Sequence, residues 1–251
     1  MDTRSAPTAR YLEIDVLRTV AIICMVIYHA AFDLAFFHSF PLEPTAGGWL
    51  WLQRLTANLF LLIVGVSFAI SYGRMTERDA GMREIVAKYW KRAALLLLIA
   101  SGISGVTYLF VGNEWIRFGA LHLIGTALLL LPLLMPLKEG TALLALLVLF
   151  LSPFLRGLSV DSALLLPLGL PPRSFASVDY LPLIPWMAPV LFGTALGNML
   201  YNRRWLRRHL PRNRFTVLLA LPGRHALMIY LLHQPILLTI LWILLRQPNI
   251  S

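Results

Sequence analysis

Long apolar runs separated by short polar segments make up most of this chain. Seven runs approach or exceed the roughly 20 residues that a membrane-spanning helix needs. They cover residues 14–37, 49–72, 93–111, 118–136, 140–155, 181–201 and 224–245. Pro153 shortens the fifth run, and three prolines in the sixth predict a kinked or broken entry to its helix. The pattern predicts an all-α, polytopic membrane helix bundle of about seven transmembrane helices, with residues 1–251 forming a single domain.

Composition supports this interpretation. Hydrophobic residues make up 58% of the chain and charged residues only 14%, with a mean hydropathy of +0.72. A soluble domain carries about 25% charged residues. Seven spans use nearly all of the 251 residues, so no separate soluble domain fits. The single cysteine, Cys24, excludes a disulfide framework and a cysteine metal site, and we expect no metal.

The net charge of +10 does not indicate nucleic acid, because the basic residues lie in short loops between apolar runs. With the N-terminus in the cytoplasm, the segments on the cytoplasmic side hold 2, 6, 1 and 6 Lys or Arg residues, fifteen in all. The opposite segments and the tail hold four. Cytoplasmic loops of membrane proteins carry such an excess of positive charge. We therefore predict a cytoplasmic N-terminus and an external C-terminus.

Four ionisable residues share one stripe of the first apolar run. At about 100° per residue, Arg18 lies about 60° from Asp15, His29 about 40° from it, and Asp33 returns to nearly 0°. Charge in hydrocarbon costs several kcal/mol unless it faces a cavity or a partner. The stripe therefore predicts a polar path through the membrane. In the alternative interpretation, Asp15 and Arg18 are an interfacial pair and His29 packs between helices.

The predicted topology separates the remaining polar groups by depth. Acid–base groups collect toward the outer side or the middle of the membrane: His29, Asp33, His38, Asn58, His122, Asp179, Tyr180 and His233. A second set lies toward the cytoplasm: Asp15, Arg18, Arg92 and Arg224. This polarity suits a reaction whose donor is an anionic phosphate compound from the cytoplasm and whose acceptor lies outside or in the membrane.

Five stretches together resemble a known family. They are E-I-D-V-L-R-T-V-A-I-I-C-M-V-I-Y-H (13–29), L-F-L-L-I-V-G-V-S (59–67), R-F-G-A-L-H-L-I-G (117–125), D-Y-L-P-L-I-P-W (179–186) and P-G-R-H-A-L-M-I-Y-L-L-H-Q-P (222–235). In combination and order they resemble the compact bacterial members of the heparan-alpha-glucosaminide N-acetyltransferase catalytic-domain family, part of a wider transmembrane acyltransferase superfamily. The spacing of Arg18 and His29 also resembles the first-helix signature of bacterial membrane sugar O-acyltransferases.

The resemblance implies a multi-pass protein of the bacterial cytoplasmic (inner) membrane. Its donor would be acetyl-CoA or another acyl-CoA, and its acceptor an amine or hydroxyl of a cell-envelope sugar or glycolipid. Membrane lipid is the other expected partner, nucleic acid is not expected, and a homodimer is allowed. The family's functional positions carry over onto Arg18, His29, Asp33, His122, Asp179, Trp186, Arg224 and His233. Thr19 and Ala226 stand where the family has Gly and Ser. In eukaryotic relatives an Asn replaces His29, and the histidine lies near His38.

The expected roles follow from this chemistry. His29 or His38 acts as general base, oriented by Asp33, or a histidine is transiently acylated. Asn58, His122 or His233 stabilises the oxyanion. Donor binding is assigned to Asp15, Arg18, Arg92, Arg224 and Trp186, and acceptor binding to Asp179 and Tyr180.

Two other functions remain open from the residues alone. One is a proton-coupled transporter or flippase, because chains of Asp and His residues also relay protons. The other is a haem or quinone membrane protein with His29 and His233 as ligands.

Overall fold

The computed structural model of the protein describes residues 11–203, 205–206 and 209–245. These residues form helices and connecting segments without a β-strand, and one isolated bridge joins Phe118 and Tyr180. The prediction of an all-α bundle is confirmed. The chain divides into two compact units, one made of Met1–Phe60 with Arg207–Ser251 and the other of Leu61–Leu206. Each unit is described by itself below, and a single domain over the whole chain stays a prediction.

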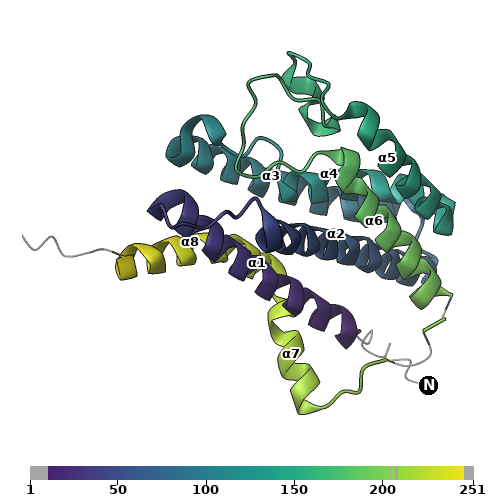
Figure 1. Ribbon diagram of the computed structural model, residues 1–251. Helices are drawn as coiled ribbons and strands as arrows, with labels where there is room; N and C mark the ends of the chain where they lie inside the picture. The colour runs from purple at the N-terminus through teal and green to yellow at the C-terminus, as the bar shows by residue number, and fades with distance from the viewer. Residues whose placement is uncertain (1–10, 204, 207–208, 246–251) are drawn as a thin grey trace, which may run out of the picture. The chain divides into compact units, whose positions relative to one another are not determined.

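The first unit is built around the long N-terminal helix. It contains α1 (Leu12–His38), the first half of α2 (Gly47–Thr76), α7 (Arg214–Arg224) and α8 (Ala226–Leu245). Helix α1 packs against both α7 and α8, the two yellow helices that end the chain (Figure 1). Two segments that are about 200 residues apart in sequence therefore become neighbours.

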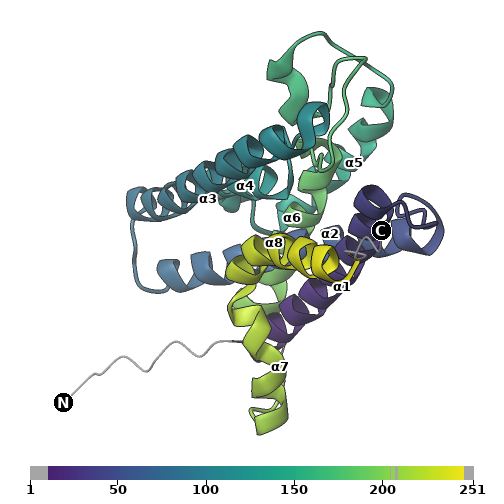
Figure 2. The same ribbon diagram turned by 90° about the vertical axis from the view of Figure 1, so that its left-hand side faces the viewer.

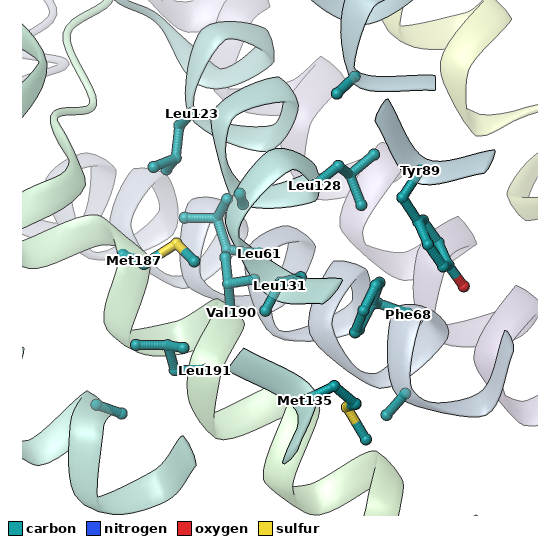
Figure 3. Close-up of a cluster of buried hydrophobic side chains, with 14 of the residues drawn as sticks. Leu61, Phe68, Tyr89, Leu123, Leu128, Leu131, Met135, Met187, Val190 and Leu191 are labelled. Atoms are coloured by element: carbon teal, nitrogen blue, oxygen red, sulfur yellow. The ribbon is translucent and has the colours of Figure 1, made fainter. Parts of the chain in front are cut away.

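The second unit holds the main apolar core. It contains the rest of α2, then α3 (Met82–Val111), η1 (Gly112–Glu114), α4 (Ala120–Leu134), η2 (Met135–Gly140), α5 (Thr141–Leu155), η3 (Ala163–Leu168), α6 (Leu183–Gly197) and the π-helical turn η4 (Asn198–Asn202). Helices α3 and α4 lie side by side, as do α5 and α6 (Figures 1 and 2). Figure 3 shows the buried side chains between them: Leu61, Phe68, Tyr89, Leu123, Leu128, Leu131, Met135, Met187, Val190 and Leu191.

Glycines bring α2 and α6 close together inside this core. A Cβ atom on Gly65 would overlap the Val190 carbonyl oxygen, and one on Gly193 would overlap the carbonyl oxygen of Leu62. Membrane helices associate through such small residues because lipid supplies no hydrophobic force between helices. The α2–α6 crossing therefore depends on positions without side chains.

Within the part of the chain that the structure describes, six helical stretches are long and apolar enough to cross a membrane. They are Leu12–His38, Gly47–Thr76, Met82–Glu114, Ala120–Leu155, Leu183–Asn202 and Ala226–Leu245. The fourth contains α4, η2 and α5 and is kinked at Lys138, where φ is 51°. The contacts at its two ends indicate whether it forms one span or two.

Contacts inside the second unit show that the chain reverses direction between α4 and α5. Beyond α5, the Val178 N–H donates to the Glu114 carbonyl oxygen at 2.8 Å, so this segment lies beside the connection that precedes α4. Between α4 and α5, the Glu139 carboxylate accepts hydrogen bonds from Asn198 at 2.6 Å and Arg203 at 2.8 Å, both at the end of α6. Helices α4 and α5 therefore run in opposite directions, which agrees with the prediction of about seven transmembrane helices.

The predicted spans coincide with helices, with two differences. Helix α3 begins at Met82, eleven residues before the predicted span, because the basic segment there is already helical. Helix α7 was not predicted at all, although Asn213 caps it by accepting from the Thr216 N–H at 2.8 Å. The kinked entry predicted for the sixth span is confirmed, since Ile184 has non-helical φ and ψ values.

Candidate functional site

The ionisable stripe of α1 faces the other helices of its unit. Asp15 and Asp33 are buried, at 4% and 0% exposure, whereas Ile23 and Ile27 on another face of α1 are about half exposed. Helical periodicity places residues four apart on one face, so His29 and Asp33 point the same way. The stripe forms two clusters, one near each end of α1.

The guanidinium cluster consists of Asp15, Arg18 and Arg224. Arg18 donates from Nη1 to Asp15 Oδ1 at 2.8 Å, and the Nε of Arg224 lies 3.7 Å from Asp15 Oδ2. The buried Arg224 Nε has no hydrogen-bond partner among the described residues. Two guanidinium groups therefore lie at the Asp15 carboxylate, and the cluster offers one donor, Arg224 Nε, without a partner among the described residues.

A threonine fixes α7 against α1 beside this cluster. Thr19 Oγ1 donates to the Leu219 carbonyl oxygen at 2.7 Å and accepts from the Gly223 N–H at 2.9 Å. A Cβ on Gly223 would overlap the Asp15 carbonyl oxygen, so glycine alone allows this approach. We call these contacts the Thr19 bridge. The bridge places Arg224, one residue after Gly223, next to Asp15.

The imidazole cluster consists of His29, Asp33, His233 and Gln234. The rings of His29 and His233 have centroids 4.9 Å apart and are tilted by 58°. Gln234 donates from Nε2 to Asp33 Oδ1 at 2.6 Å. Adjacent residues of α8 thus contact residues one turn apart on α1.

Four buried polar atoms of this cluster have no hydrogen-bond partner among the described residues: His29 Nδ1, Asp33 Oδ2, His233 Nε2 and Gln234 Oε1. An unpaired buried polar group costs about 1–3 kcal/mol, so four in one place indicate a site that water or a ligand completes. The described residues contain no group of three or more metal-ligating side chains.

Hydrogen bonding fixes the proton position on His233. Its Nδ1 lies 2.6 Å from the Tyr230 carbonyl oxygen, and a carbonyl can only accept, so Nδ1 carries the proton. In the neutral ring Nε2 is then the unprotonated nitrogen. The unpartnered Nε2 atom of His233 is therefore ready to accept a proton.

Two other predicted residues of the first unit are engaged elsewhere. His38 Nδ1 lies 3.4 Å from the carbonyl oxygen of Asp33, at the C-terminal end of α1. Asn58 donates from its amide to the Arg54 carbonyl oxygen of its own helix at 2.7 Å and is exposed. The structure does not bring either side chain into contact with the imidazole pair.

Asp179, Tyr180 and His122 lie in the second unit, where Asp179 and His122 cap α4. Asp179 Oδ2 accepts from the Ala120 N–H at 3.0 Å, and His122 Nδ1 accepts from the Gly119 N–H at 3.3 Å. Tyr180 donates to the Leu166 carbonyl oxygen at 2.7 Å. Burial raises the pKa of Asp179 to about 6, although the Ala120 hydrogen bond opposes that rise. Satisfying the free N–H groups of a helix start is a structural task for Asp179 and His122. Acceptor binding by Asp179 and Tyr180 and oxyanion stabilisation by His122 stay predictions.

Arg92 and Trp186, predicted to bind the donor, also belong to the second unit. Arg92 is exposed on α3, and Trp186 packs against the apolar core from α6. Their role in donor binding stays a prediction.

Sequence reasoning did not assign roles to Gln234 and Thr19. Gln234 directly follows His233 in sequence. It therefore reaches Asp33 on the stripe of α1 when α8 packs against that helix. The sequence does not indicate the role of Thr19, because its hydrogen-bond partners are about 200 residues away in sequence.

Comparison with known proteins identifies the family of the chain. No curated protein and no solved structure matches the chain. The family model described as "Heparan-alpha-glucosaminide N-acetyltransferase, catalytic" matches residues 10–235, which include both clusters of α1 and all of α7. The chain therefore belongs to the heparan-alpha-glucosaminide N-acetyltransferase catalytic family, a family of membrane acetyltransferases.

Proposed function

We propose that the protein transfers an acetyl group from cytoplasmic acetyl-CoA to an amine of a cell-envelope sugar or glycolipid, in the bacterial inner membrane. The observation that carries the proposal is the pair of polar clusters along α1. One presents cationic groups, and the other presents unpaired acceptors beside two imidazoles. Arg18 and His29 lie about 16 Å apart along the helix axis, comparable to an extended pantetheine arm.

The guanidinium cluster suits the phosphates of the donor. Guanidinium groups bind phosphate oxygens with paired N–H donors and keep their charge at any physiological pH. Asp15 holds Arg18 and lies close to Arg224, so both cations are already oriented before the donor arrives. Arg92 and Trp186 are proposed as further donor contacts.

The imidazole cluster suits an amine acceptor better than a hydroxyl. Asp33 Oδ2, Gln234 Oε1 and His233 Nε2 are all acceptors without a partner among the described residues. A neutral primary amine offers two N–H donors and keeps a lone pair for the attack, whereas a hydroxyl offers one donor. The same atoms cannot donate to an oxyanion, so His233 supports the acceptor nucleophile and not the oxyanion.

In the proposed reaction, the acceptor nitrogen attacks the thioester carbonyl carbon. A C–N bond forms, the C–S bond breaks, and the electron pair of that bond leaves with the CoA sulfur. His233 Nε2 takes the proton from nitrogen, and that proton neutralises the departing thiolate. Asp33 and Gln234 orient the amine, and His29 lies against the ring of the base. His29 and His38 remain the alternative bases.

Two other functions are weaker. Ring centroids 4.9 Å apart leave no space for a porphyrin between His29 and His233, which disfavours the haem alternative. A transporter, flippase or quinone protein requires no CoA. Thermal stabilisation of the purified protein by CoA therefore separates acyl transfer from these alternatives, because a ligand that binds the folded state raises the melting temperature.

The test is acetyl transfer from labelled acetyl-CoA in proteoliposomes. His233→Ala should lower kcat by about 100-fold or more, since a general base contributes 10²–10⁴-fold, whereas Arg18→Gln should raise the KM for acetyl-CoA by about tenfold. The control is His225→Ala, because His225 is exposed between α7 and α8. Transfer to an amino sugar glycoside but not to the matching hydroxyl sugar is expected. Normal rates for His233→Ala would remove the proposed base.

A further inference from the structure

Helix α7 has two faces of different character. Thr216, Ala220 and Gly223 are buried, and α7 packs on α1. On the other side Phe215 and Leu218 are exposed, at 68% and 64%. The buried residues are small or hydroxylated and the exposed ones are large and apolar. The outward face of α7 therefore suits contact with an apolar environment rather than with water.

The length and flanking charge of α7 identify that partner. Eleven residues rise about 16 Å, roughly half of the hydrocarbon core, so α7 does not cross the membrane. The segment 203–214 before it contains six arginines and no acidic residue. Arg212 and Arg214 are exposed next to the apolar face. A short helix with basic residues beside an apolar face is typical of segments that lie in the plane of a membrane surface.

We propose that α7 is an interfacial helix that binds the headgroups of anionic lipids, and that this binding holds Arg224 beside Asp15. Phe215 and Leu218 enter the acyl boundary, while Arg212 and Arg214 contact lipid phosphates. At its other end α7 carries Gly223 and Arg224, which contact Thr19 and Asp15 on α1. An anionic membrane surface therefore positions a side chain of the guanidinium cluster. The proposal does not depend on which reaction the protein catalyses.

Lipid quenching of a reporter tryptophan tests the surface. Phe215→Trp is placed in the full chain, in proteoliposomes of phosphatidylcholine with a minority of phosphatidylglycerol, and the bromine quencher is put on one lipid or the other. Stronger quenching by brominated phosphatidylglycerol, measured against the protein without the reporter, is expected. The double substitution Arg212→Gln with Arg214→Gln should lower the enrichment of phosphatidylglycerol around the reporter by about fivefold per arginine lost. This factor corresponds to about 1 kcal/mol of lipid binding for each arginine.

The matched control replaces Arg156 and Arg173 by Gln. Both arginines are exposed, and their substitution removes the same charge from a different segment. Equal quenching by the two lipids, or an equal loss in the control, would overturn the proposal. Quenching by neither lipid, together with dimer crosslinks at position 215, would assign the face to a second copy and overturn it as well.

Hydrogen exchange tests the connection to the guanidinium cluster. The Gly223 amide, which donates to Thr19 Oγ1, should exchange more slowly in phosphatidylglycerol nanodiscs than in phosphatidylcholine nanodiscs. The Arg212/Arg214 double variant should lose this difference, and the Arg156/Arg173 double variant should keep it. Identical exchange of the wild-type amide in both lipids would disprove the coupling, whatever the acetyl-transfer assay gives.

Discussion

Asp33 and Asp179 illustrate how single carboxylates take different roles. Asp33 uses one oxygen for Gln234 and leaves the other without a partner among the described residues, next to two imidazoles. Asp179 instead accepts the Ala120 N–H, a free donor at the start of α4. A Cβ on Gly119 would overlap Asp179 Oδ2, so the glycine admits the carboxylate. An unsatisfied oxygen indicates a binding site, whereas a satisfied one indicates structure.

The raised pKa of Asp179 predicts a pH effect on stability. Its value of about 6 lies above the ordinary 3.8, so the folded state binds this proton more tightly. The contribution of Asp179 to stability is therefore greatest below pH 4 and is lost as pH rises through 6, by at most about 3 kcal/mol. Asp179→Asn keeps an acceptor for Ala120 and cannot titrate.

Melting temperatures at pH 5 and pH 7 measure this effect. The Asp179→Asn variant should show a smaller decrease between the two pH values than wild type. Asp161→Asn, exposed in the same connecting segment, serves as control and should follow wild type. An unchanged pH slope in Asp179→Asn would contradict the assignment.

At the scale of elements, the contact between α1 and α7 depends on one glycine and one threonine. The Thr19 side chain completes the hydrogen bonding of two main-chain groups on α7, and Gly223 permits the approach that makes this possible. Thr19 stands where the family resemblance led us to expect Gly. A hydroxyl at this position supplies both a donor and an acceptor, which a glycine lacks.

Gly223→Ala should destabilise the protein by about 1–3 kcal/mol, the usual effect of forcing a methyl group into a packed interface. Gly102→Ala is the matched control, because Gly102 lies in α3 with nothing near its Cβ position. That control should be neutral or slightly stabilising, since alanine favours helices by up to about 1 kcal/mol over glycine. The measurement is the melting temperature in detergent. Equal effects of the two substitutions would show that α7 does not need close contact with α1.

At the scale of the whole molecule, the topology follows from contacts between connecting segments. The segment after α5 lies beside the one before α4, and Glu139 joins η2 to the end of α6. These contacts divide the connections of the second unit into two sides. Which side is cytoplasmic stays a prediction from the distribution of Lys and Arg.

Cysteine labelling of intact cells tests this orientation. In a Cys24→Ala background, Ser159→Cys should react with a membrane-impermeant maleimide, because its segment is predicted to lie outside. Glu77→Cys, between α2 and α3, should react only after the cells are lysed. Both positions are exposed, so accessibility within the protein does not decide the result. Labelling of Glu77→Cys alone in intact cells would reverse the predicted orientation.

The sequence by itself determined the membrane helices and the α1 stripe, because hydrophobic length and helical periodicity are local properties of a chain. Asp15, Arg18, His29 and Asp33 could be placed together for that reason. Only the tertiary structure decided their partners, Arg224, His233 and Gln234, since such pairs require packing of segments far apart in sequence. It also decided that Asp179 caps α4, because the sequence does not show which distant side chain will bind the free N–H groups at the start of a helix.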